Sequence, residues 1–568
     1  MWHPRFDQPY RLGTKLISGR FAIPSGIRCT HASTIRKCFR EIPSIGIITT
    51  KSICHPPRKG YREPIYARYA PGCYINAVGL ANPGAESFLA ECEGLEVPED
   101  KFLLMSIFGS DVDTFVAAAR VLKPIADGFE LNMSCPHAKG YGAEIAQDTE
   151  LLRRITSAVA ECAGVPVFVK LSAMVPDLAG TARAAMAAGA IGITMTNTIG
   201  PAMAAFGEDP ILANKFGGLS GDGIRPLGLR GVEQVRKAIG EGAPIIGMGG
   251  VASAEHVRQY AQAGADFFGV GSALTGLDSD QMRDYLAGLA RDVRGEGPGG
   301  RNSCESDLGM DYFRTRVASR IDYDAELFKV TLEALPGEYL DGDLSGRFFF
   351  LWLPGGGEKP FAIFSAAEKS VVVRVVGDFT RRLQALEPGS EILLRGPYGR
   401  PAPTFDGGTQ VFVGGGTGIA SLLEIAHALK PGAAKQIFLL GARTGKHLFD
   451  LDRFRSLGTV LTATDDGSAG VHGYVSDLIG GVADELSPAE RKRLAFINCG
   501  PGPMIARCFE IQARIVPEER IVGSIEYMTS CGVGICGKCA SPSGALTCID
   551  GPFMKAAEFK PVGCRCRA

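Results

Sequence analysis

From about residue 20 to residue 295, short apolar runs alternate with longer segments in which apolar residues recur every three or four positions. Short runs bounded by polar or glycine positions predict buried strands, and the longer segments predict amphipathic helices. The predicted strands are 21–23, 46–49, 102–107, 128–132, 167–171, 192–195, 244–248 and 267–270. The predicted helices between them include 113–122, 149–162, 178–188, 232–239 and 254–263. Alternation of this kind over roughly 250 residues predicts an α/β fold, a (β/α)8 barrel.

The carboxyl ends of the strands form the active-site face of such a barrel. Small and polar residues follow most of the predicted strands, and each alone would pass as an ordinary loop residue. Together we expect them to converge: Ser25-Gly26, Thr50-Lys51, Asn132 with Cys135, Lys170, Asn197-Thr198, Gly249-Gly250 and Gly271-Ser272. The last two pairs are predicted to open helices, where backbone N–H groups hold a phosphate. Lys51 and Lys170 suit an electron-rich flavin.

After the glycine-rich break at 295–300, a helix is predicted over 310–320, and the pattern then changes to short alternating strands. Strands are predicted at 327–333, 348–353, 370–376 and 391–396, which indicates a small antiparallel barrel. A strand at 410–413 then leads through Gly414–Gly418 into a helix at 421–429, the pattern of a nucleotide-binding crossover. A lone glycine-rich loop is weak evidence. Further strands at 438–441, 461–464 and 495–499, each followed by a polar or glycine loop, strengthen it.

Near the C-terminus, cysteines follow the spacing Cys531-x4-Cys536-x2-Cys539-x8-Cys548. This is the plant-type [2Fe–2S] spacing, and the intervening glycines let a loop wrap a cluster. Four thiolates also suit zinc, which is the alternative. Cys564 and Cys566 follow closely, and we interpret them as tail residues.

Composition narrows the function further. The chain of 568 residues has a net charge of -1, so it lacks the basic footprint of nucleic-acid or anionic-membrane binding. No apolar run reaches the ~18 residues that span a membrane, and the N-terminus lacks the pattern of a secretory signal. We therefore expect a cytoplasmic protein without a disulfide framework.

The predicted barrel resembles the dihydroorotate dehydrogenase family over about residues 20–290. The matching stretches are Thr50–Ser52, Ile75–Gly84, Leu131–Pro136, Gly217–Gly221 and Gly247–Val251. The resemblance implies that FMN binds in the barrel mouth and that Cys135 is the general base. It implies substrate contacts from Lys51, Asn76, Asn132, Asn197 and Thr198 and from the backbone of Val78, Gly79 and Leu80. It implies FMN contacts from Ser25, Gly26, Thr50, Lys51, Asn132, Lys170, Ser220, Gly221, Gly249, Gly250, Gly271 and Ser272.

His137 departs from this family, which has Asn at that position. Histidine there is familiar from dihydropyrimidine dehydrogenases. His137 is thus a further candidate substrate contact, and the alternative function is reduction of uracil, thymine or a related enone with NAD(P)H.

The second half resembles the ferredoxin-reductase family over about residues 320–515. The resemblance implies FAD contacts from Lys359, Pro360, Phe361, Ala362, Gly377 and Thr380, although Lys359 and Ala362 replace the usual Arg and Ser. It implies nicotinamide-cofactor contacts from Gly414, Gly415, Gly416, Thr417, Gly418, Cys499, Gly500 and Pro501. The choice of NAD over NADP rests on resemblance alone.

The whole chain resembles NAD-dependent (class 1B) dihydroorotate dehydrogenase, with its catalytic barrel joined in one chain to its electron-transfer subunit. The expected domains are an FMN barrel (1–294), a linker (295–320), an FAD barrel (321–405), an NAD domain (406–518) and a [2Fe–2S] domain (519–568). The resemblance implies that dihydroorotate is oxidised to orotate, that electrons pass from FMN through the cluster and FAD to NAD+, and that the barrels form a homodimer. A non-catalytic electron-transfer protein is the alternative of another class.

Overall fold

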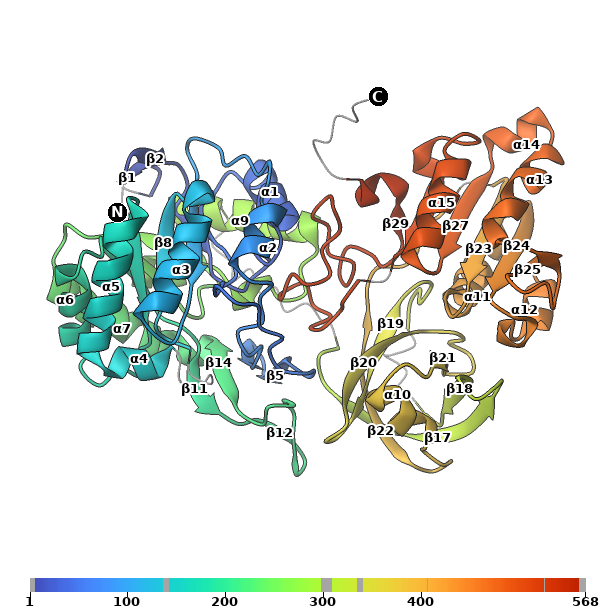
Figure 1. Cartoon of the computed structure of the whole chain (residues 1–568), viewed down its shortest axis with the longest axis horizontal. Helices are drawn as coiled ribbons and strands as arrows, with labels where there is room; N and C mark the ends of the chain where they lie inside the picture. Colours follow the sequence, from blue (N-terminus) through green and yellow to red (C-terminus); the bar gives the residue numbers. More distant parts are fainter. Residues whose placement is uncertain are drawn as a thin grey trace. The chain divides into compact units, whose positions relative to one another are not determined.

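The computed structural model describes residues 6–135, 142–297, 309–334, 341–405, 407–525 and 527–560. The chain folds into two compact units, drawn in Figure 1. The first comprises Met1–Asp307 together with Val533–Lys538, and the second comprises Leu308–Gly532 together with Cys539–Ala568. His137, Cys564 and Cys566 lie outside the described residues.

A closed parallel barrel forms the centre of the first unit, as the alternating pattern predicts. Its strand order is β10-β15-β16-β3-β4-β7-β8-β9, and each neighbouring pair is parallel. The strands are β3 (Phe21–Ile23), β4 (Ile45–Thr49), β7 (Phe102–Ile107), β8 (Gly128–Asn132), β9 (Val167–Leu171), β10 (Gly192–Met195), β15 (Ile245–Met248) and β16 (Phe267–Gly269). Their bounds agree with the predicted ranges to within one residue.

Helices surround this barrel in Figure 1. They are α1 (Ala32–Glu41), α2 (Ala85–Glu91), α3 (Val112–Leu122), α4 (Ala143–Gln147), α5 (Thr149–Ala163), α6 (Leu178–Ala187), α7 (Arg225–Ile239), α8 (Ala254–Gln262) and α9 (Ser279–Arg294). Helix α7 begins well before the predicted start at 232. Pro226 lies in its first turn, where the missing N–H costs no hydrogen bond.

Two small sheets close the ends of the barrel. The hairpin of β1 (Tyr10–Leu12) and β2 (Lys15–Ile17) places Leu12 and Ile17 in the same apolar cluster as Ala22 and Ile47 of the barrel strands. A four-stranded antiparallel sheet has the order β11-β14-β6-β5. It consists of β5 (Tyr66–Ala70), β6 (Cys73–Asn76), β11 (Ile199–Ala202) and β14 (Gly217–Gly221). This sheet was not predicted, and its strands carry Asn76 and Ser220 toward the strand ends of the barrel.

The second unit begins with a six-stranded antiparallel sheet of order β20-β19-β22-β17-β18-β21. Its strands are β17 (Phe313–Asp322), β18 (Leu327–Leu332), β19 (Phe348–Leu353), β20 (Gly357–Ala362), β21 (Ser370–Arg374) and β22 (Glu391–Tyr398). The prediction of a helix over 310–320 is wrong, because buried Thr315 and Val317 alternate with exposed Arg314 and Arg316. The predicted antiparallel arrangement is observed. Among the described residues the edge strands β20 and β21 share no ladder, so the sheet is not a closed barrel.

A mostly parallel sheet follows, with the order β26-β25-β24-β23-β27-β28-β29. Its strands are β23 (Thr409–Gly415), β24 (Lys435–Ala442), β25 (Thr459–Thr464), β26 (Val471–His472), β27 (Ala495–Cys499), β28 (Ile521–Ser524) and β29 (Met554–Lys555). Helices α11 (Gly418–Leu429) and α12 (Leu451–Arg455) pack on one face. Helices α13 (Leu478–Asp484) and α15 (Gly502–Gln512) pack on the other. This is the doubly wound arrangement that the crossover at 410–429 predicts.

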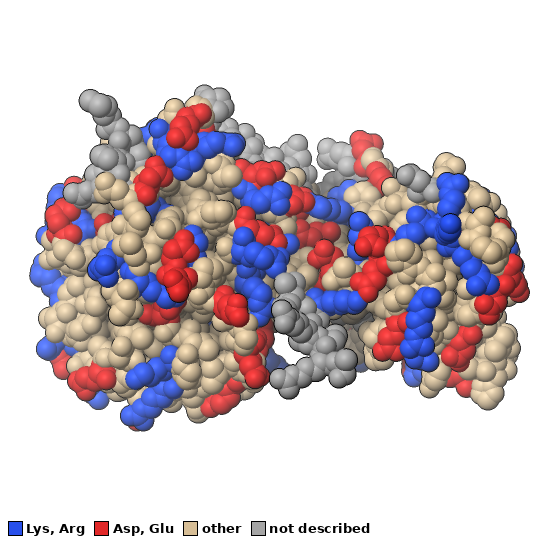
Figure 2. Space-filling model, turned by 90° about the horizontal axis from the view of Figure 1, so that it is seen from above, with Lys and Arg blue, Asp and Glu red and all other residues tan. Residues whose placement is uncertain are grey.

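Charges are mixed on the face that Figure 2 shows, where Lys and Arg side chains are interspersed with Asp and Glu. Within the part of the chain that is described, no helix has the length and hydropathy needed to cross a bilayer.

Candidate active site

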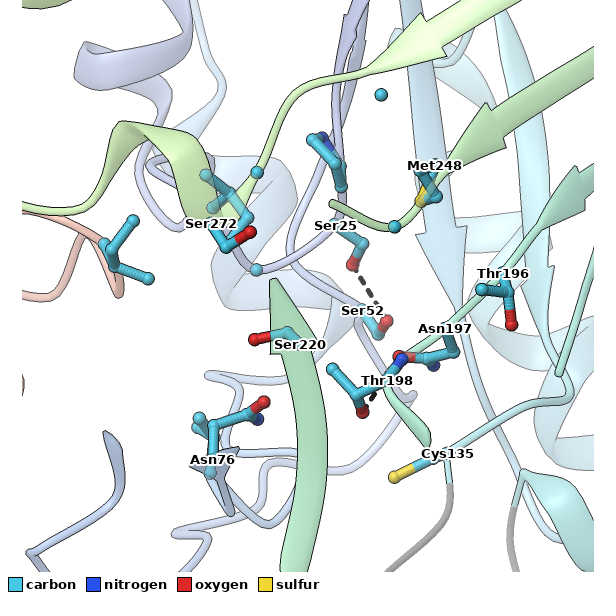
Figure 3. A pocket seen from close by; sticks show the side chains of 18 of the residues that line it. Ser25, Ser52, Asn76, Cys135, Thr196, Asn197, Thr198, Ser220, Met248 and Ser272 are labelled. Atoms are coloured by element: carbon cyan, nitrogen blue, oxygen red, sulfur yellow. Dashed lines mark hydrogen bonds between the residues drawn. The ribbon is translucent and has the colours of Figure 1, made fainter. Parts of the chain in front are cut away.

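A cavity of about 170 Å³ lies in the first unit where the barrel strands end. Figure 3 shows the side chains from the strand ends and from the antiparallel sheet converging on this one space. Most of the predicted FMN and substrate residues line it: Ser25, Gly26, Lys51, Asn76, Val78, Leu80, Asn132, Cys135, Lys170, Asn197, Thr198, Ser220, Gly221, Gly249, Gly250, Gly271 and Ser272. Ile535 and Cys536, which belong to the same unit, line it as well.

Two predicted residues do not line the cavity. Thr50 is fully buried, and its Oγ1 accepts a hydrogen bond from the Ser106 amide at 3.0 Å. Its side chain therefore bonds to the neighbouring barrel strand and does not line the cavity. Gly79 has a φ of +73° and lies where a Cβ would meet the Tyr61 ring at 2.8 Å. Its place in the turn, rather than a pocket contact, explains the glycine.

The sequence reasoning assigned no role to several lining residues, among them Ser52, Tyr66, Thr196 and Met248. Ser52 directly follows the predicted site residue Lys51, and this neighbouring position is the only feature of the sequence that could have indicated its role. Its Oγ accepts a hydrogen bond from Asn132 Nδ2 at 2.9 Å and lies 3.1 Å from Ser25 Oγ, the bond drawn in Figure 3. Ser52 therefore holds the amide of a predicted substrate residue.

The amides that follow β8 and β10 are connected to one another. Asn132 Oδ1 accepts hydrogen bonds from Ser134 Oγ at 3.0 Å and from Asn197 Nδ2 at 3.5 Å. Asn197 Nδ2 also donates to Ser134 Oγ at 2.9 Å, and Asn197 Oδ1 accepts from the Thr198 amide at 2.7 Å. Interlocked amides of this kind have fixed orientations and therefore recognise a planar polar ring by its own donors and acceptors.

Two lysines supply positive charge to the cavity. Lys170 is buried, and its Nζ lies 3.7 Å from Glu130 Oε1. Burial lowers the pKa of Lys51, and the nearby thiols of Cys29 and Cys135 oppose that change. Glu130 balances the charge of Lys170, so Lys51 is the lysine of this wall that would favour an anionic cofactor or substrate.

The loops after β15 and β16, which the sequence predicts to hold a phosphate, both line the cavity. Gly249 and Gly250 have φ values of +119° and +69°, and a Cβ on Gly250 would lie 2.8 Å from the Gly221 carbonyl oxygen. The Tyr260 hydroxyl donates to the carbonyl oxygens of Met248 and Gly249 at 3.1 and 2.7 Å. The prediction that these loops open helices needs correction: α8 starts only at Ala254 with Ser253 as its cap, and Ser272 opens a three-residue 3₁₀ turn.

Cys135 lies in an apolar part of the cavity wall. Its side chain is only 6% exposed and clusters with Cys54, Leu80 and Phe108. A sulfur that is buried from the surface yet lines a cavity is placed to exchange a proton with a molecule bound there.

The comparisons with known proteins agree with this geometry. Residues 13–291 match the family described as dihydroorotate dehydrogenase. The catalytic subunit of dihydroorotate dehydrogenase B (NAD(+)) from Pyrococcus abyssi is 37% identical over 279 residues, which are 48% of this chain and 90% of that protein. The chain belongs to the dihydroorotate dehydrogenase family. The corresponding Pyrococcus horikoshii subunit is 37% identical over 293 residues, 50% of this chain and 94% of that protein.

These dihydroorotate dehydrogenase relatives match only about half of the chain. A solved structure of the NADH-dependent reduced ferredoxin-NADP oxidoreductase, reported for flavin-based electron bifurcation, covers 43% of this chain and 88% of its own. Its sequence identity to this chain is 29% and its TM-score is 0.38.

Beyond the dihydroorotate dehydrogenase barrel, the second unit holds a cavity of about 490 Å³. All the predicted FAD residues line it: Lys359, Pro360, Phe361, Ala362, Gly377 and Thr380. Lys359 and Arg374 place two cations in its wall, which suits a pyrophosphate. Thr380 Oγ1 accepts from the amides of Val376 and Gly377 at 2.9 and 3.0 Å and thereby holds the start of α10 (Asp378–Gln384).

The residues predicted for the nicotinamide cofactor divide between two cavities. Thr417, Gly418, Cys499 and Gly500 line the 490 Å³ cavity. Gly415, Gly416, Thr417 and Pro501 line a second cavity of about 270 Å³, which also contains Arg443, His447, Asp465 and Tyr474. Gly414 lines neither, because it is buried in β23, where a Cβ would lie 2.9 Å from Leu422. Thr417 belongs to both walls, so the glycine loop separates two neighbouring ligand spaces.

The predicted cluster cysteines are all buried. Within the second unit, Cys548 exchanges side-chain hydrogen bonds with Cys531 and Cys539, which raise the pKa of Cys548 and lower that of Cys539. Gly532, Gly534 and Gly537 all have φ between +70° and +80°, so this loop needs glycine. Thiols in contact suit an iron–sulfur cluster. No group of three or more His, Cys, Asp or Glu in the described ranges is arranged to hold a metal ion, so the cluster remains a prediction.

Proposed function

We propose that this chain oxidises dihydroorotate to orotate and passes the electrons to NAD+. The observation that carries the proposal is the cavity at the barrel strand ends, which Cys135, Lys51 and the linked amides of Asn132 and Asn197 line together. Membership of the dihydroorotate dehydrogenase family supports it, as do relatives described as catalytic subunits of dihydroorotate dehydrogenase B (NAD(+)).

The predicted substrate and flavin residues of the cavity each have a proposed role in this reaction. Asn76, Asn132, Asn197 and Thr198 hold the pyrimidine ring, and Lys51 balances the substrate carboxylate. Cys135 removes the proton from the ring carbon next to the carbonyl, and its shielded position keeps that proton away from bulk water. Lys170 and the loop at Gly249-Gly250, which line the same cavity, would hold FMN, and that flavin would supply the acceptor for the hydride from the adjacent carbon.

The second unit would carry the electrons onward. We propose the FMN barrel at 1–294, a linker at 295–320, the FAD domain at 321–405, the NAD domain at 406–518 and the [2Fe–2S] domain at 519–568. The sheets overlap two of these boundaries, because β17 already begins at Phe313 and because β28 and β29 belong to the parallel sheet. The 490 Å³ and 270 Å³ cavities support separate FAD and NAD sites. Electrons from FMN would pass through the cluster to FAD and then to NAD+. We expect the active form to be a homodimer through the barrels.

A substrate comparison tests the reaction. Steady-state rates are measured with dihydroorotate and either NAD+ or NADP+, and with uracil and NADH. We expect turnover with dihydroorotate and NAD+. Activity only with uracil would refute the proposal and favour the dihydropyrimidine dehydrogenase-like alternative that His137 suggests.

Substitution of the thiol tests the role of Cys135. Cys135→Ser is expected to lose at least about a hundredfold in rate near neutral pH, since a general base contributes that much or more. Cys54→Ser is the matched control, because Cys54 belongs to the same apolar cluster but does not line the cavity. Full activity of Cys135→Ser would show that another group is the base.

Cofactor analysis tests the second unit. We expect equal amounts of FMN and FAD on extraction, together with two iron and two sulfide per chain. Zinc without sulfide would refute the cluster, and flavin content without any pyrimidine activity would favour a non-catalytic electron-transfer protein.

A further inference from the structure

A carboxylate is buried directly beneath the substrate amides. Glu130 and Asn132 are two residues apart on β8, so their side chains point to the same side of the strand. Glu130 is 0% exposed, and its Oε1 accepts a hydrogen bond from Ser106 Oγ at 3.1 Å. Lys170 Nζ lies 3.7 Å from the same oxygen. Oε2 is also buried and has no hydrogen-bond partner among the described residues. A buried charge is costly unless it is paired and hydrogen-bonded, and Glu130 has Lys170 as an ion-pair partner and Ser106 as a hydrogen-bond donor.

The carboxylate determines the direction of a chain of hydrogen bonds. A carboxylate only accepts, so Ser106 must donate to it. The 2.9 Å contact between Ser52 Oγ and Ser106 Oγ is therefore donated by Ser52. Ser52 Oγ in turn accepts from Asn132 Nδ2 at 2.9 Å and from Ser25 Oγ at 3.1 Å. Each hydroxyl between Glu130 and Asn132 thus has one permitted orientation.

This direction, together with the Ser134 backbone N–H that donates to Asn132 Oδ1 at 3.4 Å, sets what Asn132 presents to a ligand. With Nδ2 held by Ser52, Oδ1 is turned toward Ser134 and Asn197, which donate to it at 3.0 and 3.5 Å. The second N–H of Asn132 Nδ2 makes no hydrogen bond with any described residue, and Asn132 lines the cavity. The site therefore offers an N–H donor at this point, which suits a carbonyl oxygen of the ring and disfavours a ring N–H.

We propose that Glu130 is the positioning residue of this site. Through Ser106 and Ser52 it sets the amide of Asn132 in its donor orientation, and through its ion pair it holds Lys170 in place for the flavin. The inference rests on the proposed function, because it takes the cavity to bind the pyrimidine. Glu130 itself touches neither ligand and does not line the cavity.

Two variants separate the two arms of this role. Ser106→Ala cuts the chain to Asn132 and leaves the Glu130–Lys170 pair intact. Glu130→Gln removes the charge, and its side-chain NH₂ group can donate where the carboxylate only accepted. Thr194→Val is the matched control, because Thr194 is a fully buried barrel residue on β10 that lies outside the cavity lining and the chain. Glu130→Asp keeps the charge and is the conservative variant.

The readouts are orotate affinity, from the flavin absorbance change, and FMN affinity of the apoprotein, from quenching of flavin fluorescence. We expect Ser106→Ala to weaken orotate binding about tenfold, the cost of one misdirected hydrogen bond, and to weaken FMN binding by less than Glu130→Gln does, because the Glu130–Lys170 pair remains. Glu130→Gln is expected to weaken orotate binding and FMN binding by about tenfold or more each. Glu130→Asp, which keeps the charge, is expected to weaken each of the two affinities by less. Thr194→Val is expected to match the wild type.

Wild-type orotate affinity in Ser106→Ala would overturn the orienting role of the chain. Wild-type FMN affinity in Glu130→Gln would overturn the role toward Lys170. If Glu130→Gln does not fold, Ser106→Ala decides the orienting role and Glu130→Asp decides the role toward Lys170. Absence of orotate binding by the wild-type protein would instead refute the proposed function, and the role of Glu130 with it.

Discussion

The ion pair between Arg395 on β22 and Glu358 on β20 is the most deeply buried one described in the second unit. The side chains are 1% and 0% exposed. Arg395 binds both carboxylate oxygens, at 2.7 and 2.8 Å. Its Nη1 also donates to Tyr398 OH at 2.8 Å and to the Cys531 carbonyl oxygen at 3.0 Å, and Tyr312 OH donates to Glu358 Oε1 at 2.8 Å. The pair thus anchors the first cysteine of the predicted cluster loop.

Removal of one partner would leave a buried charge without compensation. We expect Arg395→Met, or Glu358→Leu, to destabilise the second unit by about 3–5 kcal/mol each. The double variant buries no charge, but it leaves the Tyr312 hydroxyl and the Cys531 carbonyl without their present partners. At about 1 kcal/mol or more for each such group, the double variant should lose roughly 2–3 kcal/mol. The two single losses sum to about 6–10 kcal/mol, so the coupling energy should be at least about 3 kcal/mol.

Hydrogen–deuterium exchange of the full chain measures this locally, because amides of β19 and β22 report the opening of the antiparallel sheet. A loss of about 4 kcal/mol corresponds to about a thousandfold lower protection. Amides of β8 and β9 in the barrel are the internal control and should be unaffected. Additive losses, with a coupling energy below about 1 kcal/mol, would refute the reasoning.

Three further predictions concern the barrel. Tyr260→Phe removes the hydroxyl that holds the Met248 and Gly249 carbonyls, and it should weaken FMN binding by roughly five- to tenfold in a fluorescence titration; unchanged affinity would contradict this. Burial lowers the pKa of Lys51 in the folded protein below its usual 10.5. The unfolded chain therefore binds that proton more tightly, so the free energy of unfolding rises with pH between the folded-state pKa of Lys51 and 10.5. Lys51→Met should abolish that rise and stabilise the apoprotein by about 1 kcal/mol at neutral pH in denaturant titrations, while dihydroorotate oxidation is lost. Burial and the nearby charge of Arg225 also lower the pKa of His256 in the folded protein below its usual 6.5. The free energy of unfolding should therefore fall as the pH drops from 6.5 to the folded-state pKa of His256. In His256→Asn, the amide oxygen can accept the hydrogen bond from the Ala252 N–H but does not titrate. Melting temperatures of this variant between pH 5 and 7 should therefore fall less at low pH than those of the wild type.

The local pattern of the sequence predicted the elements of the barrel almost completely. Eight apolar runs became the eight strands of the closed barrel, because a strand that is buried on both faces must be apolar throughout. The polar and glycine residues that follow these runs became the cavity lining, since the strands of a parallel barrel all end at one face. Of the residues predicted for FMN and substrate there, only Thr50 and Gly79 fail to line the cavity, and His137 lies outside the described residues.

Weaker local signals were misjudged or missed. Strand β17 was predicted as a helix, because its period-two alternation covers only a few positions between arginines. The sheet of β5, β6, β11 and β14 was missed because its strands are short and come from two distant parts of the chain. Its register, with Asn76 opposite Gly218, depends on pairing between segments more than 100 residues apart.

The sequence by itself therefore determined the barrel, the nucleotide-binding crossover and the identity of most cavity residues, since these follow from periodicity and from the position of a residue at a strand end. Only the tertiary structure decided which polar groups face one another. That Glu130 ends a chain of hydrogen bonds from Asn132 depends on the register of β4, β7 and β8, which places Ser52, Ser106 and Glu130 within reach of one another. Periodicity predicts which side chains point inward, but not which inward side chains meet, because that is set by packing between strands distant in sequence.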